Sequence, residues 1–506
     1  MPVARTLAVA LHGVDGSIVE IEADLANGLP AFTIIGLPDT ALGEAKDRVR
    51  SAATNSGCDL PSRKVTVNLS PASLPKHGSG FDLGIAVAAL ATSGVVSTEA
   101  IAKVVHLGEL SLDGRLRPVA GVLPAVLAAR RAGARAVVVP SGNVDEAGLV
   151  PGIRVIGAAS LRDVLIRHGA ALEALPVDAL AAPEAGAVVV ESGDLADVVG
   201  HPEAVEALQV AAAGGHHMLM LGPPGAGKTL LASRLPGLLP DLEPDAAVEV
   251  SSIRSLAGLP LGSSLVTRPP IEAPHHSATM AALVGGGSGL VRPGAISRAA
   301  HGVLFLDEAP EFSGAVLDAL RQPLETGEIT IHRARTVARF PARFQLVLAA
   351  NPCPCGHGGS DECTCTPIMR RRYLGRLSGP LLDRIDLHLT VRRVGVAQMT
   401  EGAPGATTTA EARARVVEAR HRGRERWGDQ GWSLTSHVPG PALRSPRWRL
   451  AAADRAALDR ALERGAVTMR GYDRVLRVAW TLADLDGDDR PTADHLGRAL
   501  YLRKGI

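Results

Sequence analysis

The sequence predicts an α/β protein of about three domains, on the basis of three observations. The chain has 506 residues, of which 46% are hydrophobic and 21% are charged, and this is ordinary globular usage. Short β-branched runs such as Lys64–Leu69 and Ala136–Pro140 alternate with Ala-rich helical runs such as Gly121–Ala132. From about residue 407 the pattern is helical. Its helical runs are Ala410–Trp427, Arg449–Arg464 and Tyr472–Leu485.

Composition shifts along the chain give the expected domain boundaries. We expect a compact α/β or α+β domain over residues 1–168, followed by an Ala/Pro-rich linker over 169–190. Residues 191–400 alternate strand and helix with Gly-rich turns, which favours a parallel sheet with flanking helices. Residues 401–506 are expected to form a separate helical domain.

The charge balance excludes a chain that is basic throughout. The net charge is +1, but residues 351–506 carry 26 basic and 18 acidic side chains, a net +8, against −7 over residues 1–350. The basic part is either an ordinary solvated surface or a face that contacts phosphates. No apolar run is long enough to cross a membrane and no signal peptide is evident, so we expect a cytoplasmic protein that does not act at a membrane.

A Gly-rich motif points to phosphate binding. It follows an apolar strand, Met218–Leu221, and opens a helical run, which is the context such a loop requires. Backbone N–H groups would surround the phosphates, Lys228 would reach the β- and γ-phosphates, and Thr229 would offer its hydroxyl to Mg²⁺. The sequence therefore predicts an ATP–Mg²⁺ site. Its binding residues are Gly222, Pro223, Pro224, Gly225, Ala226, Gly227, Lys228 and Thr229.

Three further motifs supply groups for hydrolysis. The apolar run that begins at Gly302 ends in Asp307, expected to hold Mg²⁺, and Glu308, expected to polarise the attacking water. The strand Phe344–Ala350 ends in Asn351, whose amide would orient that water; the alternative is a turn-forming Asn before a proline. Arg384 is either an arginine finger for a neighbouring subunit or a partner of the aspartates beside it.

Together these motifs resemble an AAA+ ATPase. The segments Ala273–Gly287, Arg292–Phe312 and Ala349–Gly356 resemble its magnesium-chelatase-like subgroup more narrowly. From about Ala4 to Leu502 the whole chain resembles the YifB/ComM family. The resemblance implies a P-loop AAA+ core, a Lon-protease-like (ribosomal-S5-like) α/β domain at the amino end, and a helical lid at the carboxyl end.

The resemblance also implies roles that spacing alone does not. Arg470 matches the sensor 2 arginine of the lid, which reads the γ-phosphate, with Arg474 as the fallback. Gly285–Leu290 would form the tip of an insert, and Ile329–Phe340 a hairpin before the Asn351 strand; both are expected to point into the pore of a ring. Arg333 and Arg335 at the hairpin turn are candidate contacts to the DNA backbone, unless the hairpin is an ordinary exposed one.

The amino-terminal domain resembles the Lon protease domain without its catalytic residues. A protease of this type uses a Ser nucleophile and a Lys base. By motif, these positions fall on Gly80 and about Ala125, which cannot do that chemistry, although Ser79 lies one position away. We therefore expect a non-catalytic scaffold.

Four of the five cysteines crowd into a thirteen-residue stretch. Cys353, Cys355, Cys363 and Cys365 form two C-x-C pairs, which either bind Zn²⁺, with His357 as a possible substitute ligand, or remain free thiols. The pair His275 and His276 is interpreted as structural, since no third ligand is apparent.

The resemblance implies a ring-forming ATPase, expected as a hexamer, that moves along DNA and branch-migrates or unwinds recombination intermediates, as in natural transformation. One alternative is the ATPase of a metal-insertion complex, although the metal-adhesion motif D-x-S-x-S is not found and the extra amino-terminal domain argues against it. A Lon-like protease or protein-remodelling ATPase is disfavoured by Gly80 and Ala125. A non-enzymatic DNA-binding scaffold is disfavoured by the complete hydrolytic set.

Overall fold

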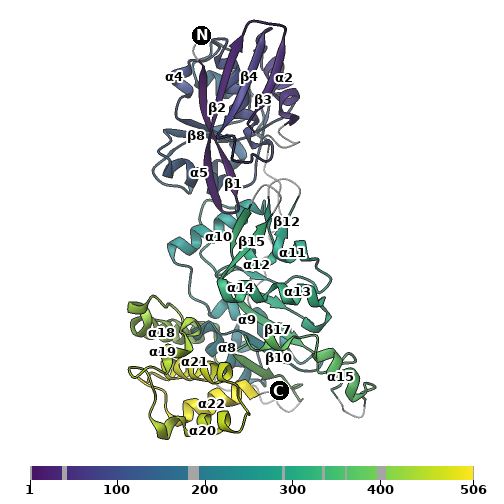
Figure 1. Ribbon diagram of the computed structural model, residues 1–506, viewed down its shortest axis with the longest axis vertical. Coiled ribbons are helices and arrows are strands. Elements are labelled where there is room, and N and C mark those ends of the chain that lie inside the picture. Colours follow the sequence, from purple (N-terminus) through teal and green to yellow (C-terminus); the bar gives the residue numbers. More distant parts are fainter. Residues whose placement is uncertain are drawn as a thin grey trace.

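The computed structural model describes residues 3–36, 43–180, 193–287, 291–332, 337–358, 362–395 and 406–504. A domain built on a mixed sheet and a domain built on a parallel sheet follow one another along its long axis, and a helical domain packs beside the second of these (Figure 1). The mixed α/β class predicted from the sequence is confirmed. Part of the predicted linker, residues 181–190, lies outside the described residues.

The first domain contains a seven-stranded sheet in the order β3-β4-β2-β1-β5-β8-β9. The pairs β1–β2 and β2–β4 are antiparallel, and the other pairs are parallel. Its strands are β1 (Ala4–His12), β2 (Asp15–Ala26), β3 (Ala31–Ile35), β4 (Lys64–Ser70), β5 (Val104–His106), β8 (Ala136–Pro140) and β9 (Arg154–Ala158). A small hairpin joins β6 (Glu109–Leu110) to β7 (Leu116–Arg117).

Helices cover both faces of this sheet. On one face, all ten residues of α3 are buried, and they pack in a core of Ala, Val and Leu because aromatic residues are few. On the other face, α5 contributes Val122, Leu123 and Val126 to a second core. The helices of this domain are α2 (Ala45–Asn55), α3 (Asp82–Ala91), α4 (Thr98–Ile101), α5 (Val122–Arg131), α6 (Val144–Gly148) and α7 (Leu161–Arg167).

The positions that match the Lon dyad hold no catalytic group. Gly80 lies in a short turn before α3, and Ala125 is buried in α5. Ser79 donates a hydrogen bond to the Glu109 carboxylate rather than to a lysine. The buried Lys76 ammonium donates to backbone carbonyls, among them that of Leu69 at 2.8 Å, and burial lowers its pKa. These contacts fit a structural role for the domain.

The second domain contains a five-stranded, fully parallel sheet in the order β11-β14-β17-β10-β18. Its strands are β10 (Met218–Leu221), β11 (Ile271–Glu272), β14 (Val303–Leu306), β17 (Gln345–Ala350) and β18 (Leu387–Thr390). Because the strands are parallel, the residues that follow β10, β14 and β17 meet at one edge. The helices of this domain are α8 (Pro202–Gly214), α9 (Lys228–Leu238), α10 (Pro244–Leu256), α11 (Met280–Val284), α12 (Ala295–Arg298), α13 (Gly314–Ala319), α14 (Arg321–Thr326), α15 (Pro367–Leu374) and α16 (Gly379–Leu382).

Two small hairpins lie toward the first domain (Figure 1). They are β12 (Gly285–Gly286) with β13 (Arg292–Pro293), and β15 (Glu328–His332) with β16 (Val337–Pro341). Both match the inserts expected from the sequence. Residues 288–290, and residues 333–336 with Arg333 and Arg335, lie outside the described residues.

The base of the β15–β16 hairpin docks on the first domain, which the sequence did not predict. Gly13, after β1, forms a bridge to Arg339 in β16. Phe340 is buried in an apolar cluster that includes Leu256 and receives Leu11 and Val14. The hairpin therefore joins the two domains.

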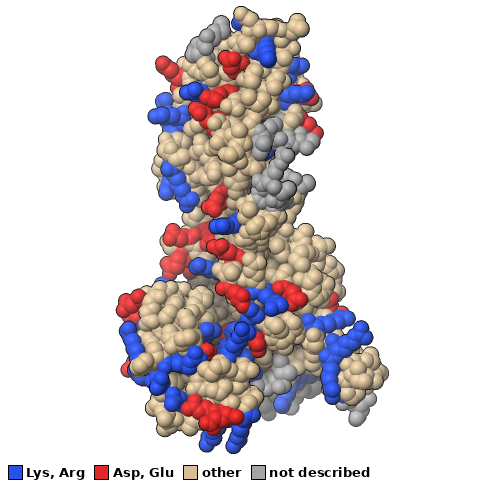
Figure 2. All heavy atoms as spheres, viewed as in Figure 1, with Lys and Arg blue, Asp and Glu red and all other residues tan. Residues whose placement is uncertain are grey.

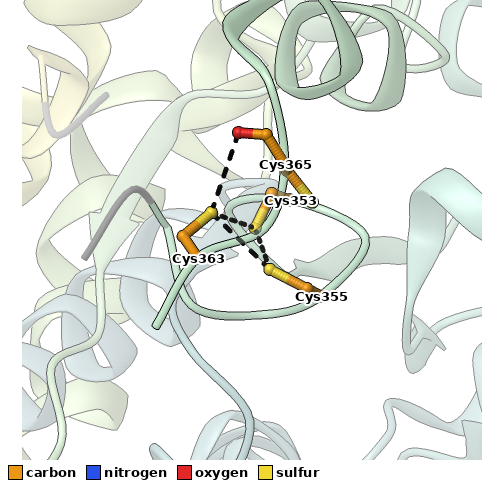
Figure 3. A group of neighbouring side chains, drawn as sticks. All are labelled: Cys353, Cys355, Cys363 and Cys365. Atoms are coloured by element: carbon orange, nitrogen blue, oxygen red, sulfur yellow. Dashed lines mark hydrogen bonds between the residues drawn. The ribbon is translucent and has the colours of Figure 1, made fainter. Parts of the chain in front are cut away.

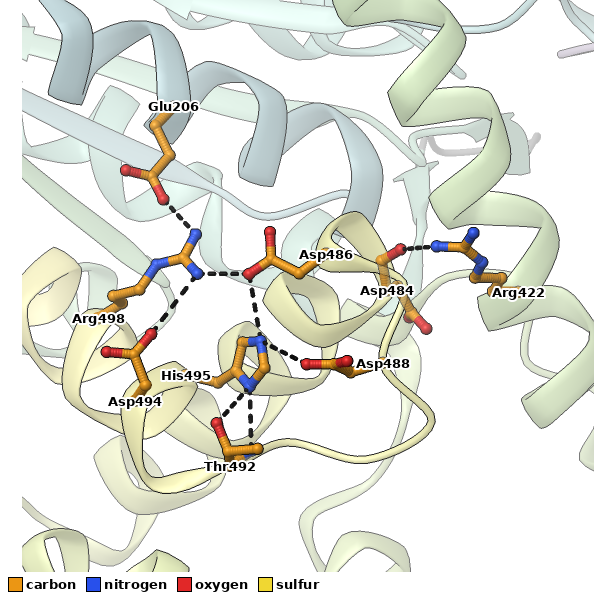
Figure 4. Close-up of polar contacts among 9 residues, drawn as sticks. All are labelled: Glu206, Arg422, Asp484, Asp486, Asp488, Thr492, Asp494, His495 and Arg498. Atoms are coloured by element: carbon orange, nitrogen blue, oxygen red, sulfur yellow. Dashed lines mark hydrogen bonds and ion pairs between the residues drawn. The ribbon is translucent and has the colours of Figure 1, made fainter.

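The helical domain packs against α8, α9 and β18 of the second domain. Its core stacks Trp427, Trp448 and Trp480, with ring centroids 4.7–5.9 Å apart. Arg498 of the last helix bridges Asp486 of α21 and Glu206 of α8, which ties the helical domain to α8 of the second domain (Figure 4). Among the described residues, no helix is both long and apolar enough to cross a membrane. The helices are α18 (Thr409–Trp427), α19 (Gly440–Leu443), α20 (Ala452–Glu463), α21 (Met469–Asp486) and α22 (Ala493–Lys504).

Candidate functional site

The Gly-rich loop lies between β10 and α9, as its motif predicts. Gly227 has a φ of +88° and is the N-cap of α9, which begins at Lys228. The first residue, Gly222, passes so close to the end of β18 that a Cβ would lie 2.1 Å from the Val391 carbonyl oxygen. The loop therefore brings the positive end of the α9 dipole to the carboxyl edge of the sheet, where an anion is stabilised.

The Lys228 ammonium lies at the centre of this loop. Its Nζ donates hydrogen bonds to the carbonyls of Gly222 at 2.7 Å and Pro223 at 3.0 Å, and to the Asn351 side-chain oxygen at 3.0 Å. Burial lowers the pKa of Lys228, an effect that Asp307 and Glu308 oppose. The structure thus brings the predicted Lys228 and Asn351 together across two neighbouring strands.

Two oxygen donors suited to Mg²⁺ lie side by side. The Thr229 hydroxyl donates to the Asp307 carboxylate over 2.8 Å, with Thr229 at the start of α9 and Asp307 at the end of β14. A hydroxyl and a carboxylate are ligands that Mg²⁺ accepts in nucleotide sites, where it keeps water and phosphate oxygens as its other ligands. The residues present therefore fit the predicted metal.

Glu308 is held by a residue that the sequence reasoning interpreted as structural. The His276 Nδ1 atom lies 3.2 Å from the Glu308 carboxylate, and Glu308 itself has a φ of +51°, unusual for a residue with a side chain. His276 follows β11, the strand next to β14, so parallel pairing brings it to the same edge. The pair of adjacent histidines was the one feature of the sequence that could have indicated a functional role for His276. Nothing in the sequence indicated that either histidine contacts Glu308.

The two arginines predicted to act on the nucleotide lie at the opposite edge of the sheet. Arg384 pairs with Glu325, and Arg470, which is 74% exposed, lies 3.8 Å from the Asp383 carboxylate. This segment precedes β18, whose first residue pairs with the first residue of β10. The two edges are separated by the length of a four-residue strand, about 13 Å. Neither arginine is thus near Lys228 of its own chain.

A basic cleft of about 800 Å³ opens beside these two arginines. The buried Asp386 carboxylate lies in one wall and pairs with Arg474, the predicted fallback for Arg470. Although burial alone would raise the pKa of Asp386, the charge of Arg474 holds it well below its usual value. On the face shown in Figure 2, basic side chains gather over the helical domain and the projection that carries α15. The arginines that line the cleft are Arg343, Arg384, Arg420, Arg424, Arg470, Arg474 and Arg477.

The four clustered cysteines converge beside the Asn351 strand (Figure 3). Their sulfur atoms all lie within 4.8 Å of one another, and all four are free thiols. The backbone amide of His357 lowers the pKa of the Cys355 thiol to about 6. The structure therefore brings together all four cysteines of the predicted metal site.

Comparison with known protein families matches each of the three domains. Three family models match: "Magnesium chelatase, subunit ChlI" over residues 194–399, "Subunit ChlI of Mg-chelatase" over 21–143, and "Magnesium chelatase, subunit ChlI C-terminal" over 406–503. A partial match, 30% identical over 175 residues and 33% of this chain, is to the Lon protease of Mycolicibacterium smegmatis, of which it covers 22%.

Similar relatives extend over nearly the full length. An uncharacterized protein of Mycobacterium tuberculosis H37Rv is 50% identical over 100% of this chain and 99% of its own. The competence protein ComM of Haemophilus influenzae is 42% identical over 99% and 98%, and the uncharacterized protein YifB of Escherichia coli is 41% identical over 98% and 96%. The chain therefore belongs to the YifB/ComM family of magnesium-chelatase-like AAA+ ATPases.

Proposed function

We propose that this chain is the subunit of a hexameric ring motor that hydrolyses ATP to move along DNA. Its proposed substrates are recombination intermediates, which it would branch-migrate or unwind. Its family membership supports ATP hydrolysis, and AAA+ proteins are typically oligomers. The action on DNA and the hexameric assembly are what we propose beyond family membership.

The observation that carries the proposal is the division of the site between two edges of one sheet. Lys228, Thr229 and Asp307 gather at the carboxyl edge, while Arg384 and Arg470 lie beside the basic cleft at the amino edge. A site divided in this way is completed when the amino edge of one subunit faces the carboxyl edge of the next, and that heterologous contact closes a ring. Arg384 and Arg470 would then stabilise charge on the neighbour's triphosphate.

The residues at the carboxyl edge support a division of labour in hydrolysis. Lys228 would hold phosphate oxygens once the nucleotide replaces its present partners, and Asn351 would then orient the attacking water. Thr229 and Asp307 would hold Mg²⁺, which supplies charge neutralisation at the phosphates. Glu308 would accept the proton of that water, and His276 would set the carboxylate's direction.

Three observations support DNA as the partner. A relative that is 42% identical over almost the whole chain is named a competence protein. Residues 351–506 carry a net charge of +8, which suits a phosphate backbone. The β15–β16 hairpin, whose strands flank Arg333 and Arg335 in the sequence, lies at the junction of the first two domains, where a ring would present it to a central channel.

The proposed cofactors are Mg²⁺ at the nucleotide site and Zn²⁺ at the four cysteines. The proposed location is the cytoplasm, where a motor of this kind meets DNA and ATP. None of the described cysteines is paired in a disulfide, and a zinc–thiolate site is compatible with a reducing compartment.

A branch-migration assay tests the proposal. The full chain is mixed with a labelled four-way junction, ATP and Mg²⁺, and the separated duplex products are followed on a native gel. We expect products with the wild-type chain and none with Glu308→Gln, which retains the ATP site but loses the proposed base. Equal products from both proteins, or none from a wild-type chain that hydrolyses ATP, would contradict the proposed DNA function. The latter result would favour the metal-insertion alternative.

A further inference from the structure

The four cysteines have the arrangement of a soft-metal site. The Sγ–Sγ distances are 3.3 Å for Cys353–Cys355, 3.6 Å for Cys355–Cys363 and 3.8 Å for Cys353–Cys363. Four thiolates at about 2.3 Å from a tetrahedral Zn²⁺ would lie about 3.8 Å apart. The backbone N–H of Gly358 also donates to the Cys353 sulfur at 3.3 Å, a contact that stabilises a thiolate.

We call residues 353–358 and 362–376 the cysteine segment. Few apolar side chains of this segment are buried. Within it, Cys353, Gly356, Cys365 and Tyr373 are the buried residues, while Ile368 of α15 is 77% exposed. Hydrophobic burial of this extent does not offset the ordering of some twenty residues, each costing about 1–2 kcal/mol of backbone entropy. A metal bound by four converging thiols would supply a further interaction that fixes the segment.

The cysteine segment contacts the Gly-rich loop. Gly356, with a φ of +84°, lies so near this loop that a Cβ would be 2.5 Å from the Pro224 Cδ atom. Cys353 is only two residues beyond Asn351, which accepts a hydrogen bond from Lys228. The residues of the first C-x-C pair therefore lie next to both the Gly-rich loop and Asn351.

The second half of the segment reaches back to the same edge. Tyr373 of α15 is buried, which raises its pKa to about 12, and the nearby backbone of Asn351 opposes that rise. Arg376 donates to the Pro310 carbonyl at 2.9 Å and pairs with the Glu311 carboxylate at 3.1 Å, three residues after Glu308. The cysteine segment thus touches the parts of the chain that carry Lys228, Asn351 and Glu308.

We infer that the four cysteines bind one Zn²⁺ through their thiolates, and that the metal-held segment is a clamp that fixes the geometry of the nucleotide site. The inference rests on the proposed nucleotide site and makes ATP binding there depend on the zinc. The metal would take no part in hydrolysis, since its four ligands leave no open position for substrate.

The test combines metal analysis with nucleotide binding on the full chain. Zinc per chain is measured by mass spectrometry, and affinity is measured with a fluorescent ATP analogue. The double variant Cys355→Ser/Cys363→Ser is compared with Cys58→Ser, which removes the fifth cysteine, buried in the core of the first domain. We expect the double variant to lose zinc and at least about tenfold in ATP affinity, and Cys58→Ser to lose neither.

Reversible removal of zinc from the wild-type chain distinguishes an effect of zinc loss from misfolding of the double variant. Wild-type zinc is released with a mercurial, which dithiothreitol then removes, and ATP affinity is measured before and after zinc is added back. We expect affinity to fall and then recover. A wild-type chain without zinc and with four reactive thiols overturns the metal site, and unchanged affinity after zinc release overturns the clamp. A zinc-loaded wild-type chain that binds no nucleotide overturns the proposed function, and the clamp with it.

Discussion

The carboxylate proposed to activate water is held by a histidine at 3.2 Å, and this contact decides where the carboxylate points. Replacing His276 by Ala would remove this contact, so the Glu308 carboxylate would no longer be held in one direction. We predict that ATP hydrolysis by His276→Ala falls severalfold both without and with DNA, because His276 is proposed to position the base that activates water. Phosphate-release assays with and without DNA measure both rates.

The control is His275→Ala, which removes the neighbouring ring but leaves the contact to Glu308; its two rates should stay near the wild-type values. If His276→Ala keeps both rates unchanged, His276 does not position Glu308. A loss of nucleotide affinity in the variant would also contradict a purely positioning role.

A second residue-scale prediction concerns acid sensitivity of the first domain. His106 is fully buried, and its Nε2 lies 2.9 Å from His168 Nε2. Burial lowers the pKa of His106 to about 3, so it is neutral in the folded domain. The unfolded chain binds a proton below about pH 6.5, so stability falls as pH drops from there toward 3, by about 1.4 kcal/mol per pH unit.

The variant His106→Gln removes this titration. Between pH 7 and pH 5, we predict that wild-type stability falls by about 2 kcal/mol more than that of the variant, measured by urea unfolding. Burial raises the pKa of Asp82 to about 6, so protonation of this carboxyl opposes the loss of stability at low pH. Asp82 is present in both proteins, so its effect cancels when the wild-type and variant profiles are subtracted. Parallel pH profiles for the two proteins would contradict the assignment.

At the scale of elements, the sequence predicted strands and helices better than their mutual docking. The strands β10 and β8 match their predicted bounds, because apolar runs with clear turn signals define them locally. The contact of Gly13 with Arg339 joins segments more than 300 residues apart, and no local pattern encodes it. The position of Arg470 likewise depends on how α21 packs on the loop before β18.

That contact yields an element-scale prediction. A Cβ at Gly13 would lie 2.0 Å from the Arg339 carbonyl oxygen, so Gly13→Ala should push β16 away from the first domain. Gly133 has a nearly equal φ, +74° against +71°, but open space around it, so Gly133→Ala controls for backbone strain. We predict faster amide hydrogen exchange over β16 in Gly13→Ala alone. The same exchange in both variants would show that the hairpin is held by other contacts.

At the scale of the whole molecule, the groups proposed for hydrolysis lie toward opposite edges of one sheet, so the proposed active site combines two chains. The sequence predicted which residues take part, because each follows a recognisable strand or motif. It did not indicate which chain's nucleotide Arg470 would reach, since that depends on the packed position of the helical domain.

Subunit mixing tests this division. Lys228→Ala removes the phosphate contact and Arg384→Ala removes the proposed finger, so each variant alone should be inactive. When the two are co-expressed, a Lys228→Ala subunit presents an intact Arg384 to an intact site on its neighbour. We predict that ATP hydrolysis reappears in the mixture. A mixture as inactive as its components would mean that both residues serve the same chain.

The most direct measurement of the account is the steady-state ATPase rate of the full chain at low salt, without DNA and with single-stranded, duplex or four-way-junction DNA. We predict that at least one of these DNAs binds and raises the rate severalfold. We also predict that Lys228→Ala abolishes hydrolysis in every condition. Replacing Lys46, an exposed lysine of α2, by Ala should leave the rates unchanged. Hydrolysis at one unchanging rate, with no DNA bound at low salt, would contradict a DNA motor.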